Sequence, residues 1–141
     1  MSDVDLLVSL LEAEHAAVYG YGTLGGRLDA ATRPGALAAY DAHRARRDGL
    51  GARLRERGAQ TPVALAAYDV AVATTPAALA LAVRLEEGLA TRWLALVAGA
   101  QDPVLRALGV SGLQETAVRA ASWRRRLGLR PPTLALPGAR T

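Results

Sequence analysis

Four ionisable side chains interrupt apolar stripes that recur at the three- and four-residue spacing of a helix face. They are Glu14, His43, Glu86 and Glu115, and each lies about midway along its own segment. If the four segments pack side by side, these positions meet at one level of the interior. Three carboxylates and an imidazole need partners there, because an isolated charge is strongly disfavoured in an apolar environment.

Two arrangements would satisfy such a cluster. One is a metal ion, since Glu and His side chains from facing helices are the ligands of carboxylate-bridged di-iron sites. The other is a closed network of hydrogen bonds and ion pairs in which an arginine supplies a fixed positive charge. Arg47 lies one helical turn after His43 and is the first candidate for this charge. Further candidates are Arg84 and Arg119 as cations, with Tyr19 and Tyr21 as hydrogen-bond donors.

The segments that must position these side chains are bounded by helix start and stop signals. Ser2 with Asp5 is typical of a capping box, and Thr75-Pro76 and Asp102-Pro103 each place a proline after an N-cap residue. Thr32-Arg33-Pro34 is a further start signal, and glycines follow each segment. These signals predict helices over about 3–26, 33–57, 76–99 and 103–127, with an extended tail over 129–141.

Two details of the last segment and the tail stay open at this point. Gly109 and Gly112 weaken the start of the last helix, and Ser111 with Gln114 forms a second capping box, so this helix has an alternative start at Ser111. In the tail, Leu134 and Leu136 are expected to lie against the helices.

The connections indicate how the helices are arranged. The first and second helices, and the third and fourth, are joined by a few residues, which predicts two antiparallel hairpins. Residues 59–75 form a long connection between the hairpins. The fold class predicted is therefore all-α, a ferritin-like antiparallel four-helix bundle with a long crossover between helices 2 and 3. With 141 residues, the chain has the length of a single domain over 1–141.

Short motifs in several segments carry a resemblance to a known family. The most specific are residues 14–22 and 43–48, followed by 81–86 and then by 115–118, 122–123, 127–128 and 136–138. In these motifs the chain resembles the actinobacterial ferritin-like family known as domain of unknown function 4439. The resemblance implies the ferritin-like fold and no established activity. True di-iron ferritins carry Glu-x-x-His on two helices, whereas the matching pairs here are Tyr40 with His43 and Glu115 with Val118.

The composition excludes several other classes of site. The chain has no cysteine, so it has no disulfide, thiolate zinc site, iron–sulfur cluster or cysteine nucleophile. Its net charge is only +4, and acidic residues are interspersed among the arginine groups, which favours solvated faces over nucleic-acid binding. No run approaches the roughly 18 consecutive apolar residues of a membrane helix, and the acidic N-terminus differs from a signal peptide. A cytoplasmic location is expected.

Two functions from different classes are compatible with these features. The first is a non-catalytic, protein-interacting bundle without a cofactor. It would form a homodimer through apolar residues beside the core stripes of the first two helices, such as Val8, Leu11 and Val18. The alternative is a metal-binding protein or oxidoreductase that holds a single transition-metal ion on Glu14, His43, Glu86 and Glu115. Acid–base hydrolysis by a carboxylate pair is a weaker third hypothesis.

Overall fold

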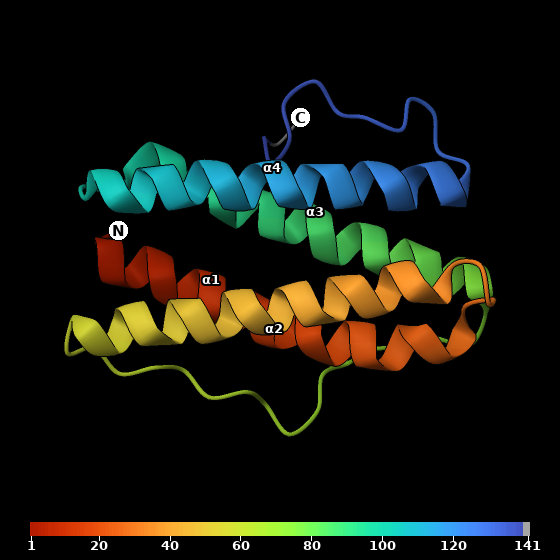
Figure 1. Cartoon of the computed structure of the whole chain (residues 1–141), viewed down its shortest axis with the longest axis horizontal. Coiled ribbons are helices and arrows are strands. Elements are labelled where there is room, and N and C mark those ends of the chain that lie inside the picture. Colours follow the sequence, from red (N-terminus) through yellow and green to blue (C-terminus); the bar gives the residue numbers. More distant parts are fainter. Residues whose placement is uncertain (140–141) are drawn as a thin grey trace.

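The computed structural model describes residues 1–139 and consists of four long helices (Figure 1). They are α1 (Asp3–Leu24), α2 (Arg33–Glu56), α3 (Thr75–Gly99) and α4 (Pro103–Leu127), with a 3-10 turn η1 (Gly25–Arg27) after α1. The described residues contain no strand. The all-α four-helix bundle predicted from the sequence is confirmed, and the helix ends lie within two residues of the predicted ones.

The helices form two hairpins joined by one long connection. Figure 1 shows α1 and α2 running in opposite directions, α3 and α4 likewise, and the connection over residues 57–74 running along the outside of the α1–α2 hairpin. The closely packed pairs are α1 with α2, α1 with α3, and α3 with α4. The fourth side, between α2 and α4, has few close backbone approaches and is bridged mainly by side chains.

The starts of α1, α3 and α4 are fixed by capping side chains, whereas the Thr32 side chain at the start of α2 makes no capping hydrogen bond. The Ser2 hydroxyl accepts a hydrogen bond from the Asp5 backbone, and the Asp5 carboxylate accepts one from the Ser2 backbone, which completes the capping box. Asp102 caps α4 by accepting from the Val104 N–H. The cap of α3 is Thr74 rather than Thr75, whose hydroxyl instead donates to the Arg27 carbonyl at 2.7 Å and ties α3 to the end of α1.

The apolar core is divided into two clusters, one toward each end of the bundle. One cluster is built from leucines of all four helices around Trp93, and the other contains Tyr21, Leu24 and Trp123 with alanines of α2 and α3. Both tryptophans are buried and pack in these clusters. The fully buried polar residues His43, Glu86 and Thr116 lie between the two clusters along their helices, and Glu14 lies near the end of the Trp93 cluster on α1.

The packing of α4 differs from the sequence prediction. The helix starts at Pro103 and is continuous through both glycines, so the alternative start at Ser111 is wrong. A Cβ atom on Gly112 would overlap the indole ring of Trp93, and one on Gly109 would lie 2.9 Å from Val97 Cγ2. The two glycines therefore let α3 approach α4 closely. The buried residues of α4 are mainly small, namely Leu105, Gly109, Gly112, Thr116, Ala120 and Trp123.

The outer face of α1 and the tail also differ from expectation. Leu11 is only 2% exposed, Val8 packs against the same core cluster and Val18 is half-buried, so α1 presents little of the apolar surface expected for a homodimer. In the tail, Leu134 is 42% exposed and lines a cavity, whereas Leu136 is 72% exposed and does not lie against the bundle. The last two residues of the predicted tail lie outside the described part of the chain.

Among residues 1–139, no helix combines the length and the apolarity that crossing a bilayer requires.

Candidate functional site

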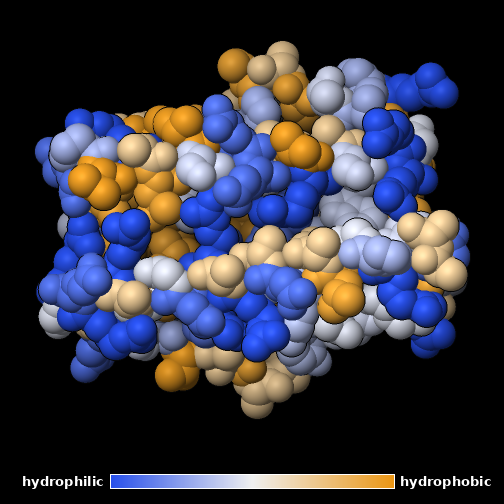
Figure 2. Space-filling view, viewed as in Figure 1, coloured by the Kyte–Doolittle hydropathy of each residue, from blue (hydrophilic) through white to orange (hydrophobic). Residues whose placement is uncertain are grey.

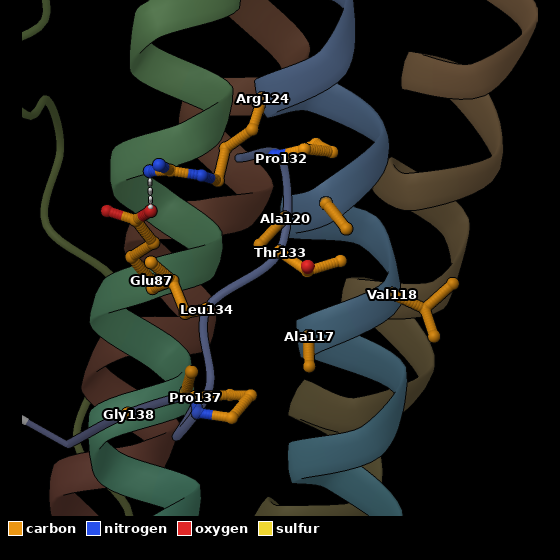
Figure 3. A pocket seen from close by; sticks show the side chains of 12 residues that line it. Glu87, Ala117, Val118, Ala120, Arg124, Pro132, Thr133, Leu134, Pro137 and Gly138 are labelled. Carbon is orange, nitrogen blue, oxygen red and sulfur yellow. Dashed lines mark hydrogen bonds and ion pairs between the residues drawn. The ribbon is translucent and has the colours of Figure 1, made fainter. Parts of the chain in front are cut away.

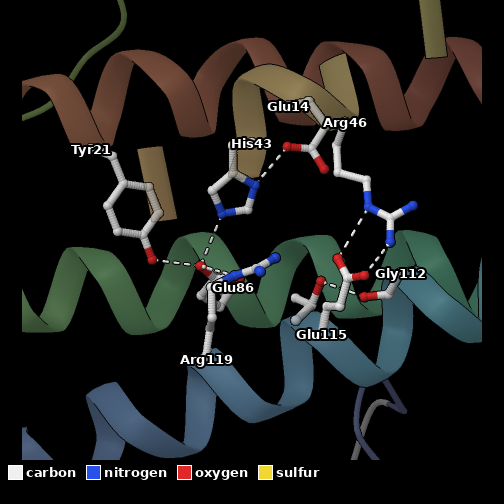
Figure 4. A network of polar contacts seen from close by, with 9 residues as sticks. Glu14, Tyr21, His43, Arg46, Glu86, Gly112, Glu115 and Arg119 are labelled. Atoms are coloured by element: carbon white, nitrogen blue, oxygen red, sulfur yellow. Dashed lines mark hydrogen bonds and ion pairs between the residues drawn. The ribbon is translucent and has the colours of Figure 1, made fainter. Parts of the chain in front are cut away.

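A buried histidine at the centre of the bundle is held between two carboxylates from different helices (Figure 4). His43 on α2 contacts Glu14 on α1 through Nδ1, at 2.7 Å from Oε2, and Glu86 on α3 through Nε2, at 2.9 Å from Oε1. All three side chains are essentially inaccessible to solvent. A neutral imidazole has one N–H, whereas two carboxylate contacts require two. The geometry is therefore that of an imidazolium bridging two carboxylates.

The charge state of His43 agrees with this geometry. Burial alone lowers the pKa of an imidazole, but the hydrogen bonds and negative charges of Glu14 and Glu86 outweigh burial and raise the pKa of His43 to about 9. Burial raises the pKa of Glu14, against the opposing effect of its contact with His43. The histidine is thus cationic at neutral pH, and its positive charge offsets the unfavourable burial of the two carboxylates.

Glu86 is the point where the network converges. Its Oε1 accepts hydrogen bonds from three donors: the Tyr21 hydroxyl at 2.5 Å, His43 at 2.9 Å and Arg119 Nε at 3.1 Å. The Tyr21 ring also stacks on the imidazole, with ring centroids 5.2 Å apart. Burial and the neighbouring Glu86 raise the pKa of Tyr21 well above its usual value, so the hydroxyl stays protonated and donates. The carboxylates of Glu14 and Glu86 and the cations of His43 and Arg119 together give the network no net charge.

Arg47 does not supply the positive charge, contrary to the prediction. Its guanidinium contacts the exposed carboxylate of Asp48 at 2.8 Å, outside the bundle. Its side chain instead lines a surface hollow together with His15 of α1 and Pro62 of the long connection. Arg119 on α4 takes the predicted role, and Tyr21 rather than Tyr19 is the donor; both were among the alternatives that the sequence left open.

Glu115 is also outside the buried network. It forms an ion pair with Arg46, with Oε1 2.6 Å from the arginine Nη2, and its side chain is 46% exposed. The true buried stripe of α4 is displaced by one residue from the predicted stripe, a rotation of about 100° that turns Glu115 toward the opening between α2 and α4. Arg46, which the sequence did not indicate, bridges this opening, and its guanidinium lies 5.4 Å from the Trp93 ring centre.

The side chains of the network do not fit a metal centre as they are arranged. A histidine ligand needs a nitrogen lone pair facing the metal, but both ring nitrogens of His43 face carboxylates. Between residues 1 and 139, no three His, Asp or Glu side chains are grouped so that they could hold a metal ion. Two buried oxygens, Glu14 Oε1 and Glu86 Oε2, have no hydrogen-bond partner within the described chain.

Comparison with known proteins places the chain in a family. The family model described as Domain of unknown function (DUF4439) matches residues 7–141. The chain belongs to the DUF4439 family. The crystal structure of a conserved hypothetical protein from Mycobacterium tuberculosis is similar, with a TM-score of 0.85 and 35% sequence identity over 88% of this chain and 96% of that chain. No curated protein gives a match.

These comparisons support the fold and the family but assign no activity to the network. In this DUF4439 protein, the motifs at residues 14–22, 43–48 and 81–86 contain the buried residues Glu14, Tyr21, His43 and Glu86. The motif residues 115–118 contain the buried Thr116, whose hydroxyl donates to the Gly112 carbonyl at 2.7 Å within α4. Arg119 lies outside the motifs and has no obvious sequence signal beyond its position one turn before Trp123.

Proposed function

We propose that the chain is a single ferritin-like domain that works without catalysis, through contacts with other protein chains. The buried network would stand where ferritin-like proteins hold their metals. Such proteins take one Glu from each of two helices and a Glu-x-x-His pair from each of the other two. Here α1 and α3 each bring one Glu, but Tyr40 and the 71% exposed Val118 stand at positions where a Glu and a His would be needed.

The observation that carries this proposal is the occupation of both imidazole nitrogens of His43. A closed contact with Glu14 and Glu86, balanced by Arg119, leaves no free nitrogen ligand and no separated acid and base for chemistry. Protein purified without chelators is therefore expected to contain far less than one transition-metal ion per chain by mass spectrometry. Its melting temperature should not change when ferrous, manganous or zinc ions are added at a few equivalents.

A metal-binding function is the second candidate, and the unpaired buried oxygens of Glu14 and Glu86 favour it. A single transition-metal ion could use these two oxygens only if His43 gave up its protons and turned. The same metal analysis decides between the two functions. One bound ion per chain that is lost in His43→Gln would support the alternative, and two bound ions per chain would contradict both proposals.

The protein-contact function has its support on the surfaces of α2 and α4. Four apolar side chains there are exposed by 43–71%, namely Leu37, Val104, Val110 and Val118. Figure 2 shows apolar surface gathered over the N-terminal half of α4, beside a charged band across the middle of the same face. Burying such side chains against a second copy would remove apolar area from water. This homodimer keeps α2 from the surface first expected and uses α4 in place of α1.

Light scattering coupled to size exclusion tests the homodimer at tens of micromolar protein. We expect the mass of a dimer for the wild-type chain and of a monomer for the double variant Leu37→Glu, Val118→Glu. Val63→Glu is the matched control, because Val63 is 83% exposed but belongs to the long connection. A monomeric wild-type protein would refute the homodimer.

Nucleic acid is not the partner proposed. The arginines are grouped at residues 44–47, 53–57 and 124–126, and each group has a member that is paired with a carboxylate. Arg46 contacts Glu115, Arg57 contacts Asp102 at 2.8 Å, and Arg124 contacts Glu87 at 2.7 Å. Paired arginines present less free positive charge to a phosphate backbone. An actinobacterial origin and a cytoplasmic location stay predictions from the sequence.

A further inference from the structure

An apolar cavity lies on the side of the bundle away from the long connection, between α3, α4 and the C-terminal tail (Figure 3). Its volume is about 200 Å³. The helices contribute mainly alanines, including Ala90, Ala117 and Ala121, and the tail contributes Leu134 and Pro137. The polar network is not part of this cavity, which is a separate feature of the fold.

The tail spans the cavity because it is held on both sides of it. On one side, Arg124 Nη2 donates to the Pro131 carbonyl at 3.4 Å. On the other, Gly138 has a φ of +82° and lies so close to the Ala90 carbonyl that any side chain at this position would overlap it. Between these points Leu134 is 42% exposed and does not fill the space over the alanines. The hollow thus follows from small residues on α4 and a tail that is held away from them.

One end of the cavity is polar, and one N–H group there has no hydrogen-bond partner. Arg124 lines the cavity and pairs with Glu87 through Nη1 at 2.7 Å, which balances the charge of both groups. Arg124 Nε is buried and finds no acceptor within residues 1–139. A buried N–H without a partner is unfavourable by about 1–3 kcal/mol, so an acceptor atom would be stabilised there. Since the arginine charge is already balanced, that acceptor need not be an anion.

We propose that this cavity binds a small, uncharged, mainly hydrocarbon molecule that carries one carbonyl oxygen. The apolar lining matches the hydrocarbon body, and the Arg124 Nε–H would donate to the oxygen. An apolar cavity of about 150 Å³ is enough to bind benzene, so a volume of about 200 Å³ suits a slightly larger ring or a short branched chain. The assignment is independent of the function proposed for the polar network.

Three probes of similar size separate the contributions of shape, hydrogen bond and charge. Acetophenone carries a neutral carbonyl, ethylbenzene lacks the oxygen, and benzoate carries a charge. By ligand-observed NMR and calorimetry we expect acetophenone to bind at low millimolar concentration or tighter. Ethylbenzene should bind roughly tenfold more weakly, because it lacks the hydrogen bond from the charged guanidinium. Benzoate should bind most weakly, because its charge would be desolvated next to Glu87.

Two variants locate the binding site and test the hydrogen bond. Ala121→Leu fills the cavity and should weaken acetophenone binding roughly tenfold or more, since no space remains for the ring. Ala107→Leu is the matched control, because Ala107 is an exposed alanine of the same helix outside the cavity. Arg124→Lys keeps a positive charge beside Glu87 but has no N–H at the Nε position, so acetophenone should lose its advantage over ethylbenzene.

The outcomes decide the proposal. Binding of acetophenone that Ala121→Leu abolishes and Ala107→Leu leaves unchanged supports it, provided that circular dichroism shows both variants folded. Absence of acetophenone binding to the wild-type chain would overturn it, and so would binding that persists in Ala121→Leu. Preferential binding of benzoate would overturn the choice of an uncharged ligand.

Discussion

Removing the arginine that contacts Glu86 should destabilise the fold far more than removing the arginine one turn from His43. Arg119 lies 3.1 Å from a carboxylate that is completely buried, and its own side chain is only 20% exposed. Arg119→Ala would leave the two buried carboxylates with His43 as their only cation. Arg47→Ala removes a contact between two surface groups, and the expected loss is below about 0.5 kcal/mol.

The magnitude for Arg119→Ala follows from what remains around Glu86. Breaking a buried ion pair by removing one partner costs about 3–5 kcal/mol. His43 and Tyr21 still donate to the same oxygen, and water can enter where the arginine was, so the loss should lie below that range. We expect a decrease in unfolding free energy of about 2–3 kcal/mol, close to the value of a hydrogen bond to a charged group.

Urea unfolding followed by circular dichroism measures both variants. The midpoint should fall clearly for Arg119→Ala and hardly at all for Arg47→Ala, with unchanged slopes. Arg119→Lys should lie between them, because it keeps the charge but loses the planar guanidinium. Equal effects of the two alanine variants, or a larger effect of Arg47→Ala, would refute the assignment of Arg119 to the network.

Three further predictions concern the network and the packing around it. The pKa of His43 is raised from 6.5 to about 9, so its stabilisation is fully present below pH 6.5 and is lost as the pH rises through 9. Urea unfolding at pH 6 to 10 should show this loss, and His43→Gln should not. Tyr21→Phe removes one donor to Glu86 and should lower the unfolding free energy by about 1–2 kcal/mol in the same assay. Gly112→Ala places a methyl group against a buried indole ring. It should lower the melting temperature and reduce the free energy of unfolding by about 1–3 kcal/mol. Gly49→Ala has open space around it and should be neutral or stabilising.

The helices were predictable because their ends carry strong local signals. A capping box at Ser2, a proline after Asp102 and glycines after the segments act within one or two turns, so no tertiary information was needed. The cap of α3 was displaced by one residue because Thr74 and Thr75 are chemically equivalent candidates. Only the fold decides between them, by placing the Thr75 hydroxyl beside the Arg27 carbonyl.

The rotation of α4 was not predictable from an apolar stripe. Its buried face is made of glycine, threonine and alanine as much as of large apolar residues, since Trp93 from α3 occupies the space. A search for large apolar residues therefore selects a neighbouring face and turns Glu115 inward. Glu14, His43 and Glu86 lie inside the bundle, where their stripes place them, because their helices bury leucines, alanines and tryptophan at the expected spacing.

The position of the polar network between two apolar clusters gives it a structural role that does not depend on a ligand. Leucine and alanine surfaces tolerate sliding of one helix along another, because one apolar contact replaces a similar one. His43 tolerates no such shift, since its two nitrogens must meet Glu14 and Glu86 at the same time. A displacement of α2 by one turn would move an imidazolium into one of the apolar clusters, leave Glu14 unpaired and leave Glu86 with only Tyr21 and Arg119. The network therefore fixes the axial register of α1, α2 and α3, and Arg119 extends this constraint to α4.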